Sequence, residues 1–279
     1  MIVNLDIDKA YEYAKYIRIK TLQMALNCGK EGCHIGGSLS CVEIFSLLFS
    51  NFKKHNPTNP TDKSRDRLFV SKAHCAPCNY ATLAKAGFLT EKDLEKYRLD
   101  GGLLTGYPFN VNIGLEFTGG SLGMGLSLGV GTAFSAKRKK LDYKTYVLLG
   151  DGECNEGAIW EALMSATQYK LDNLIIIIDY NNMQYDGKNS EIMSLENLEA
   201  KLNAFGCETR VVNGHSIESL LEAFVTHSKN KPLAIVAKTI KANGIKRLEN
   251  TAESHFTSIT QEDYDLAMNE IQGGKYDRI

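Results

Sequence analysis

The sequence predicts an α/β fold: a doubly wound, mostly parallel sheet that carries helices on both faces. Two apolar runs, at residues 145–149 and 174–178, flank a helical stretch at 156–169. Runs that are apolar at every position indicate strands buried on both faces, which is typical of parallel sheets. A strand, a helix and a second strand in this order form a right-handed βαβ unit, and this alternation defines the fold class.

The other elements continue the alternation along the chain, and amphipathic periodicity, capping residues and apolar runs predict them. Helices are expected at residues 9–26, 40–52, 91–97, 123–137 and 216–228, and further strands at 208–212 and 233–238. Ser40 and Ser216 are expected to cap their helices. Cys28 and Gly29 end the first helix, and residues 56–67 form a polar loop.

Composition limits the class of protein. The chain has 279 residues, 43% apolar and 23% charged, and no Pro/Gly/Ser-rich linker divides it. We therefore expect one domain over residues 1–279, with a polar C-terminal segment from about residue 250. The net charge of −1 argues against a nucleic-acid-binding protein. With seven cysteines, no run of ~18 apolar residues and no signal-peptide core, we expect a reducing, cytoplasmic setting.

Hard oxygen ligands follow two strands of the predicted sheet. Asp151 comes directly after the first apolar run, and Asn181 follows the second, thirty residues later. In a βαβ unit these carboxyl ends lie side by side, where open parallel sheets bind ligands. A carboxylate, an amide oxygen and the Met183 carbonyl suit Mg²⁺, which takes few protein ligands together with phosphate oxygens.

A phosphate is expected beside this metal. Gly150 and Gly152 allow the backbone to approach closely, and a helix that begins near Glu156 points its N-terminal amides toward the same place. The alternative is that Gly-Asp-Gly is an ordinary turn and Asn181 a cap. The spacing of the two strand ends favours the metal-diphosphate interpretation.

The segment from Gly150-Asp151-Gly152 to Asn181 resembles the thiamine-diphosphate motif, which begins with GDG and ends with Asn about thirty residues later. The wider chain resembles transketolases in particular. Further blocks occur in that family's order: Gly32-Cys33-His34-Ile35-Gly36-Gly37-Ser38, Asp66-Arg67, Ser71-Lys72-Ala73-His74, Thr118-Gly119-Gly120-Ser121-Leu122-Gly123, Ala237-Lys238-Thr239 and Asn250 to His255. The resemblance covers nearly the whole chain and implies the thiamine-diphosphate-binding fold.

The resemblance also implies roles for individual residues. Asp151, Asn181 and the Met183 carbonyl match the family's Mg²⁺ ligands. Three histidines match residues that contact the diphosphate and donor sugar or move protons: His34, His74 and His255. The expected cofactor contacts, several of which share these roles, are His74, Gly120, Ser121, Leu122, Gly150, Gly152, Glu156, Asn181 and His255, with Glu156 near a subunit interface.

The chemistry agrees with this implication. Cleaving a ketose next to its carbonyl creates a carbanion, and thiamine diphosphate supplies the electron sink. Histidine suits the acid and base work along the sugar because its unperturbed pKa is about 6.5. The resemblance therefore implies a transferase that moves a two-carbon ketol unit from a ketose to an aldose.

One position departs from the family pattern. Tyr107, in Thr105-Gly106-Tyr107-Pro108, stands where most transketolases have a histidine that faces the donor's terminal hydroxymethyl. Deoxyxylulose-phosphate synthases, whose donor is pyruvate, are similar to this chain in having an aromatic residue there. Tyr107 is therefore a candidate site residue, and the alternative activity is acetyl transfer from a 2-oxo acid such as pyruvate onto a sugar.

A second departure concerns the length. Full transketolases continue into a domain with the glutamate that activates the cofactor, whereas this chain resembles the N-terminal subunit of a split, two-chain form. We therefore expect a partner subunit with the pyrimidine-binding domain, no activity without it, and a heterotetramer with two copies of each chain.

Two other patterns have competing interpretations. Cys75 and Cys78 form a C-x-x-C, and Cys33 and His34 would supply two more ligands to a structural zinc. Structural zinc sites normally have two well-spaced pairs, so zinc is disfavoured here. His215 also matches a family residue, but its place before a predicted helix favours a structural role.

Overall fold

The computed structural model describes residues 5–107, 111–117, 119–225 and 228–277. In these segments a single sheet of five parallel strands has the order β1-β2-β3-β5-β4. The strands are β1 (Arg67–Val70), β2 (Thr145–Gly150), β3 (Leu174–Tyr180), β4 (Glu208–Asn213) and β5 (Leu233–Lys238). The predicted doubly wound α/β class is therefore confirmed, and β2 and β3 lie next to each other at the centre of the sheet.

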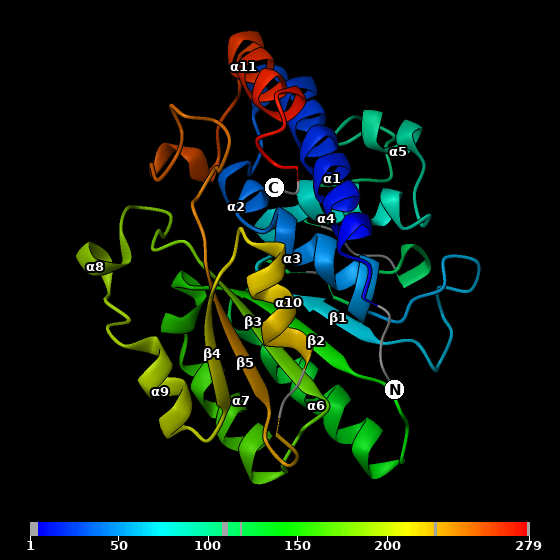
Figure 1. The fold of residues 1–279 in the computed structure, drawn as a ribbon, viewed down its shortest axis with the longest axis vertical. Helices are drawn as coiled ribbons and strands as arrows, with labels where there is room; N and C mark the ends of the chain where they lie inside the picture. Colours follow the sequence, from blue (N-terminus) through cyan, green and yellow to red (C-terminus); the bar gives the residue numbers. More distant parts are fainter. Residues whose placement is uncertain (1–4, 108–110, 118, 226–227, 278–279) are drawn as a thin grey trace.

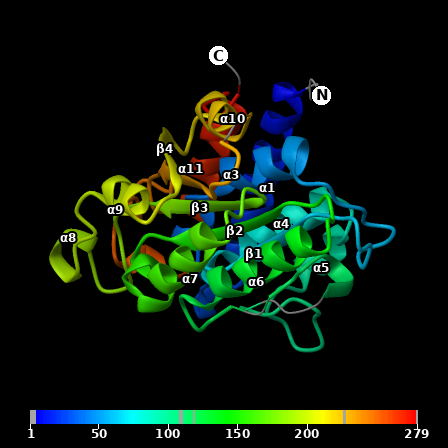
Figure 2. The same ribbon diagram turned by 90° about the horizontal axis from the view of Figure 1, so that it is seen from below.

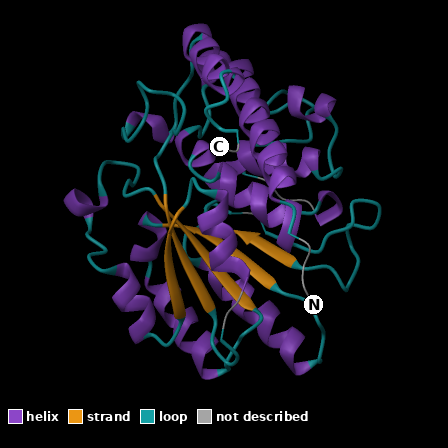
Figure 3. Cartoon of the chain, in the orientation of Figure 1, coloured by secondary structure: helices purple, strands orange, loops and turns teal. Residues whose placement is uncertain are grey.

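Helices cover both faces of the sheet, as Figure 3 shows. The helices on one face are α1 (Ile7–Asn27), α2 (Gly36–Leu39), α3 (Val42–Leu47), α4 (Ala76–Lys85), α5 (Glu91–Glu95), α10 (Ile217–Val225) and α11 (Gln261–Gln272). The other face carries α6 (Met124–Arg138), α7 (Gly157–Gln168) and α9 (Leu198–Ala204), with α8 (Asn189–Ile192) at the periphery (Figures 1 and 2). Among the described residues, none of the helices combines the length and apolarity that crossing a membrane requires.

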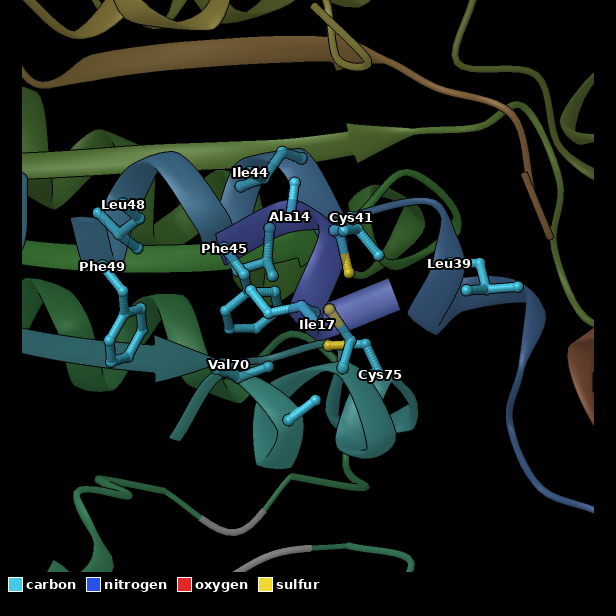
Figure 4. Packing of buried hydrophobic residues seen from close by; sticks show 14 of the residues in the cluster. Ala14, Ile17, Leu39, Cys41, Ile44, Phe45, Leu48, Phe49, Val70 and Cys75 are labelled. Atoms are coloured by element: carbon cyan, nitrogen blue, oxygen red, sulfur yellow. The ribbon is translucent and has the colours of Figure 1, made fainter. Parts of the chain in front are cut away.

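Each central strand contributes to two cores. In β3, Ile175 and Ile177 pack with α1, α3 and α4, whereas Ile176 and Ile178 pack with α6, α7 and α9. The period-2 alternation of a strand explains this division, and it explains why every position of the run is apolar. Figure 4 shows part of the first core, between α1, α3 and β1.

Local capping explains several boundaries. Ser216 accepts the Ser219 N–H at the start of α10, as predicted. Asp6, which the sequence analysis did not identify as a cap, accepts the Lys9 N–H at the start of α1. The prediction for Ser40 was wrong: α3 begins at Val42, and the Ser40 hydroxyl instead donates to Asp179 at 2.5 Å. Residues 226–227, at the end of the predicted 216–228 helix, lie outside the described residues.

The polar C-terminal segment contains a helix that the sequence analysis did not predict. A capping box between Thr260 and Asp263 starts α11, and its Ala267 and Ile271 are buried in the core that includes α1. Only a narrow apolar stripe of this helix faces the core. Most of its residues are therefore polar, and its sequence resembles that of a loop.

Candidate active site

The carboxyl ends of β2 and β3 meet, as the spacing of their polar residues predicts. Gly150 is in register with Asp179, and the Asp151 N–H donates to the Asp179 carbonyl at 3.3 Å. The Asp151 carboxylate accepts the backbone N–H groups of Gly152 and Asn182. Asp151 and the Asn181–Met183 turn therefore form one hydrogen-bonded unit.

The charge on Asp151 is poorly compensated by the protein. Its side chain is buried, and burial and the negative charge of Asp179 raise the pKa of Asp151 to about 7. The Asn181 amide oxygen accepts the Met183 N–H at 3.1 Å, and an amide oxygen has a second lone pair for a metal ion. A divalent cation would stabilise the Asp151 carboxylate and find oxygen ligands around it, so the residues present fit Mg²⁺.

Asp179 connects the strand ends, and the sequence analysis assigned it no role. Its carboxylate forms a buried ion pair with Lys72, which follows β1, and accepts hydroxyl groups of Ser40 and Thr239. Burial alone would raise the pKa of Asp179, but Lys72 and these hydrogen bonds outweigh it and lower the pKa. The signal in the sequence was an acidic residue at the end of an otherwise apolar strand.

Glu153 is a second site residue that the sequence analysis missed. Its buried carboxylate accepts the N–H of Gly150 at 3.1 Å, the N–H of Gly123 at 2.9 Å and the hydroxyl of Ser71. It thereby connects the end of β2 to the loop before α6. This loop contains Gly120, whose φ of 128° favours glycine. Thr118 of the same sequence block lies outside the described residues.

A cavity of 360 Å³ lies above the strand ends. Its lining includes eleven predicted residues: His74, Tyr107, Gly120, Leu122, Gly150, Asp151, Gly152, Glu156, Asn181, Met183 and His255. Two predicted residues are not part of this lining. Ser121 is exposed beside Leu122, and His34 lies next to the cavity against the rings of residues that line it.

The three predicted histidines come together from distant parts of the chain. The ring centroid of His34 is 6.1 Å from that of His74 and 5.4 Å from that of His255, and the other two are 5.0 Å apart. Burial, Arg98 and Lys241 lower the pKa of His34 to about 4, and burial and Lys241 lower that of His255 to about 3. Burial and Lys72 hold the pKa of His74 well below its usual value. All three histidines are therefore neutral at pH 7. In this state one nitrogen of each ring can donate a proton and the other can accept one.

Exposed aromatic rings surround His34 and His255 at the mouth of the cavity. The Tyr107 ring lies 5.6 Å from His34, and the Phe256 ring lies edge-on at 4.8 Å from it. On the other side, Tyr185 contacts His255 at 4.8 Å. The described part of the 105–108 block thus places Tyr107 beside the predicted histidine, while Pro108 lies outside the described residues.

Lys241 is a further cavity residue that the sequence analysis did not identify. It is 2% exposed, and its ammonium donates to the Gln184 carbonyl at 2.9 Å and lies 3.4 Å from His255 Nδ1. Burial and the charge of Lys72 lower the pKa of Lys241 to about 8. No local pattern marks it, since Lys241 lies in a polar stretch far from the Gly-Asp-Gly motif.

The cysteines are arranged differently from the set that zinc would need. Cys41 contacts Cys75 and Cys78 in a buried cluster, and Figure 4 labels the first two of these residues, whereas Cys33 contacts Cys28. All seven cysteines are free. In the described residues, no group of three or more His, Cys, Asp or Glu side chains is arranged to hold a metal ion.

Comparison with known families identifies the class to which this fold and site belong. Residues 10–275 match the model of the transketolase thiamine diphosphate binding domain. The chain therefore has a thiamine diphosphate binding domain, as its resemblance to the thiamine-diphosphate motif implied. More specifically, it belongs to the transketolase family.

Individual relatives agree with this assignment. The chain is 40% identical over 240 residues to an apulose-4-phosphate transketolase subunit of Phocaeicola vulgatus, covering 85% of each chain. It is 38% identical over 263 residues to the 6-deoxy-6-sulfo-D-fructose transketolase subunit SqwG of a Clostridium species, covering 93% of this chain and 94% of that one. Transketolase from Leishmania mexicana superposes with a TM-score of 0.87 at 29% identity. The alignment covers 97% of this chain but 42% of that longer one.

Proposed function

We propose that this chain is the N-terminal subunit of a two-subunit transketolase-like enzyme, which transfers a two-carbon ketol unit from a ketose to an aldose. The observation that carries the proposal is the meeting of Asp151 and Asn181 at neighbouring strand ends, beneath a cavity that is lined by His74 and His255 and flanked by His34. The relatives named as separate transketolase subunits, which match this chain over most of their length, support it.

In this proposal the strand ends hold the diphosphate. Asp151, Asn181 and the Met183 carbonyl would bind Mg²⁺, and Gly150 and Gly152 leave room for phosphate oxygens beside it. Thiamine diphosphate supplies the electron sink that carbon–carbon cleavage needs. Gly120, Ser121 and Leu122 belong to the loop that would contact its rings, and Glu153 fixes that loop through the Gly123 N–H.

The histidines would handle protons along the sugar. His34, His74 and His255 are partly buried and neutral, so each can accept a proton from one hydroxyl and donate one to another oxygen. Lys241, beside His255, adds a positive charge that would attract a phosphate or a developing oxyanion.

The donor in this proposal is a ketose. The relatives are named for apulose 4-phosphate and for 6-deoxy-6-sulfo-D-fructose, both sugars, and they do not favour the pyruvate alternative. Tyr107 remains the residue that would adjust donor choice, because its phenol lies next to His34 at the mouth of the cavity. A bulky phenol there limits the space for a donor's terminal hydroxymethyl more than a smaller side chain would.

The exposed face of α6 and α7, with the loop before α6, would accept the partner subunit. Four large apolar side chains are exposed there: Leu122, Met124, Leu128 and Met164. Glu156 and Leu122 belong both to this face and to the cavity lining, so a partner bound here would close over the cofactor. We infer an assembly with two copies of each chain, and a reducing, cytoplasmic setting that agrees with seven free cysteines.

The test is reconstitution with the companion subunit, for which the candidate is a neighbouring gene product that carries the pyrimidine-binding domain. Ketol transfer is expected only when both chains, thiamine diphosphate and Mg²⁺ are present, with ketose phosphates as donors and no turnover of pyruvate. Full activity of this chain alone would contradict the need for a partner. Exclusive use of pyruvate would contradict ketol transfer.

A further inference from the structure

The turn that carries Lys241 into the cavity is held from behind by a buried polar network. Lys241 lies between Ile240 and Ala242, and the Ala242 N–H donates to the Gly36 carbonyl at 3.0 Å. The network forms hydrogen bonds with two further residues of this turn, at the Ile240 N–H and the Asn243 carbonyl. The position of the Lys241 ammonium therefore depends on groups that never reach the cavity.

His215 provides the contact to Ile240. Its Nε2 accepts the Ile240 N–H at 2.8 Å, and its Nδ1 lies 2.9 Å from Glu43 Oε2. Because Nε2 accepts a hydrogen bond, the proton of the neutral ring is on Nδ1, which donates it to Glu43. The ring thus connects the turn to α3 in one defined orientation.

Arg18 provides the contact to Asn243. Its guanidinium donates to the Asn243 carbonyl at 2.7 Å and forms an ion pair with Glu43. Burial alone would raise the pKa of Glu43, but Arg18 and His215 outweigh it and lower the pKa to about 2. The Arg18 and Glu43 side chains are almost fully buried. A buried, hydrogen-bonded network of this kind holds the turn in a fixed position.

We propose that His215 is a positioning residue, which sets the place of Lys241 in the cavity through its hydrogen bond to the Ile240 N–H. The inference rests on the proposed function, because the place of Lys241 matters only if an anionic cofactor or substrate enters the cavity. His215 itself is not among the residues that line the cavity. Its side chain lies behind the turn, against Glu43 and Asn243.

The test compares two substitutions of His215 in the complex with the companion subunit. His215→Phe keeps the bulk of the ring but removes the acceptor, and His215→Gln keeps an acceptor for the Ile240 N–H. The expected result for His215→Phe is about 10-fold weaker binding of thiamine diphosphate by titration calorimetry, and faster hydrogen exchange of the Ile240 amide. His215→Gln should restore most of both. His55→Phe is the matched control, since His55 lies outside this network and accepts no such bond.

A purely structural role would give a different pattern. If His215 acts through Lys241, then His215→Phe should weaken binding no further in a Lys241→Ala background. An equal loss in that background, or unchanged exchange and affinity in His215→Phe, would overturn the inference. If the unsubstituted complex binds no thiamine diphosphate, the proposed function is wrong, and faster exchange at Ile240 in His215→Phe alone would still support the anchoring role of His215.

Discussion

At the scale of single residues, Asp151 is the clearest test of the metal site. The carboxylate is buried, and its pKa is raised by burial and by Asp179. Asp151→Asn keeps the shape of the side chain but removes the charge that a divalent cation needs. We expect the affinity of the assembled enzyme for thiamine diphosphate in the presence of Mg²⁺ to fall by about 100-fold, which is roughly 3 kcal/mol.

Titration calorimetry of the complex with and without Mg²⁺ measures this loss. Asp172→Asn is a suitable control, because Asp172 lies before β3, at the end of the sheet opposite to the cavity. The Mg²⁺ dependence should disappear in the first variant and persist in the second. Unchanged affinity in Asp151→Asn would mean that the strand ends serve some other ligand.

His34 leads to a prediction about pH. Its pKa in the folded chain is about 4, against about 6.5 in an unfolded chain. The unfolded state therefore binds more protons between these values, and stability falls as the pH drops from 6.5 toward 4. After allowance for partial exposure, we expect His34 to account for a loss on the order of 1 kcal/mol between pH 6.5 and pH 5.

Urea unfolding at several pH values measures this contribution. His34→Asn cannot titrate in this range, so its free energy of unfolding should fall less steeply with decreasing pH than that of the unsubstituted chain. The exposed residue Lys30 is the control, and Lys30→Gln should leave the slope unchanged. Equal slopes for His34→Asn and the unsubstituted chain would show that the histidine is not desolvated in solution.

At the scale of elements, the four strands β2 to β5 were the most predictable part of the fold, whereas the sequence analysis did not predict β1. The runs at 145–149 and 174–178 became β2 and β3 within two residues of the predicted ends, because each is apolar on both faces and enters two cores. The relation between Asp151 and Asn181 followed directly, since the ends of adjacent parallel strands are fixed by the sheet.

Elements whose signals depend on distant contacts were harder to predict. Serine is a common helix cap, but the hydroxyl of Ser40 donates its hydrogen bond to the Asp179 carboxylate at the end of β3 instead. The helix α11 buries only a narrow stripe against α1, so its sequence is mostly polar. Glu153 belongs to the site through its hydrogen bond to the loop before α6, and Lys241 through its hydrogen bond to Gln184. Hydrogen bonds between distant residues produce no periodic pattern in the sequence.

At the scale of the whole molecule, α6 and α7 present a group of exposed apolar side chains beside the cavity. Met124 is 50% exposed, Leu128 42% and Met164 62%, and they lie on helices that pack against each other. A group of exposed apolar side chains beside a cavity is typical of an interaction site. A companion subunit on this face would cover the side chains and close the cavity in one step.

The last prediction follows from this face. Leu128→Asp introduces a charge that would be buried in the proposed interface, and desolvating an unpaired charge is costly. Leu128 is exposed in the single chain, so the free energy of unfolding should change by no more than about 0.5 kcal/mol. Association with the companion subunit, measured by analytical ultracentrifugation, should weaken by at least about 100-fold, and ketol transfer should fall with it.

Leu266→Asp is the matched control, because Leu266 is 60% exposed on α11, which covers the other face of the sheet. If Leu128→Asp associates normally while Leu266→Asp does not, the partner binds on the α11 side, and the cavity must then be completed by a different surface.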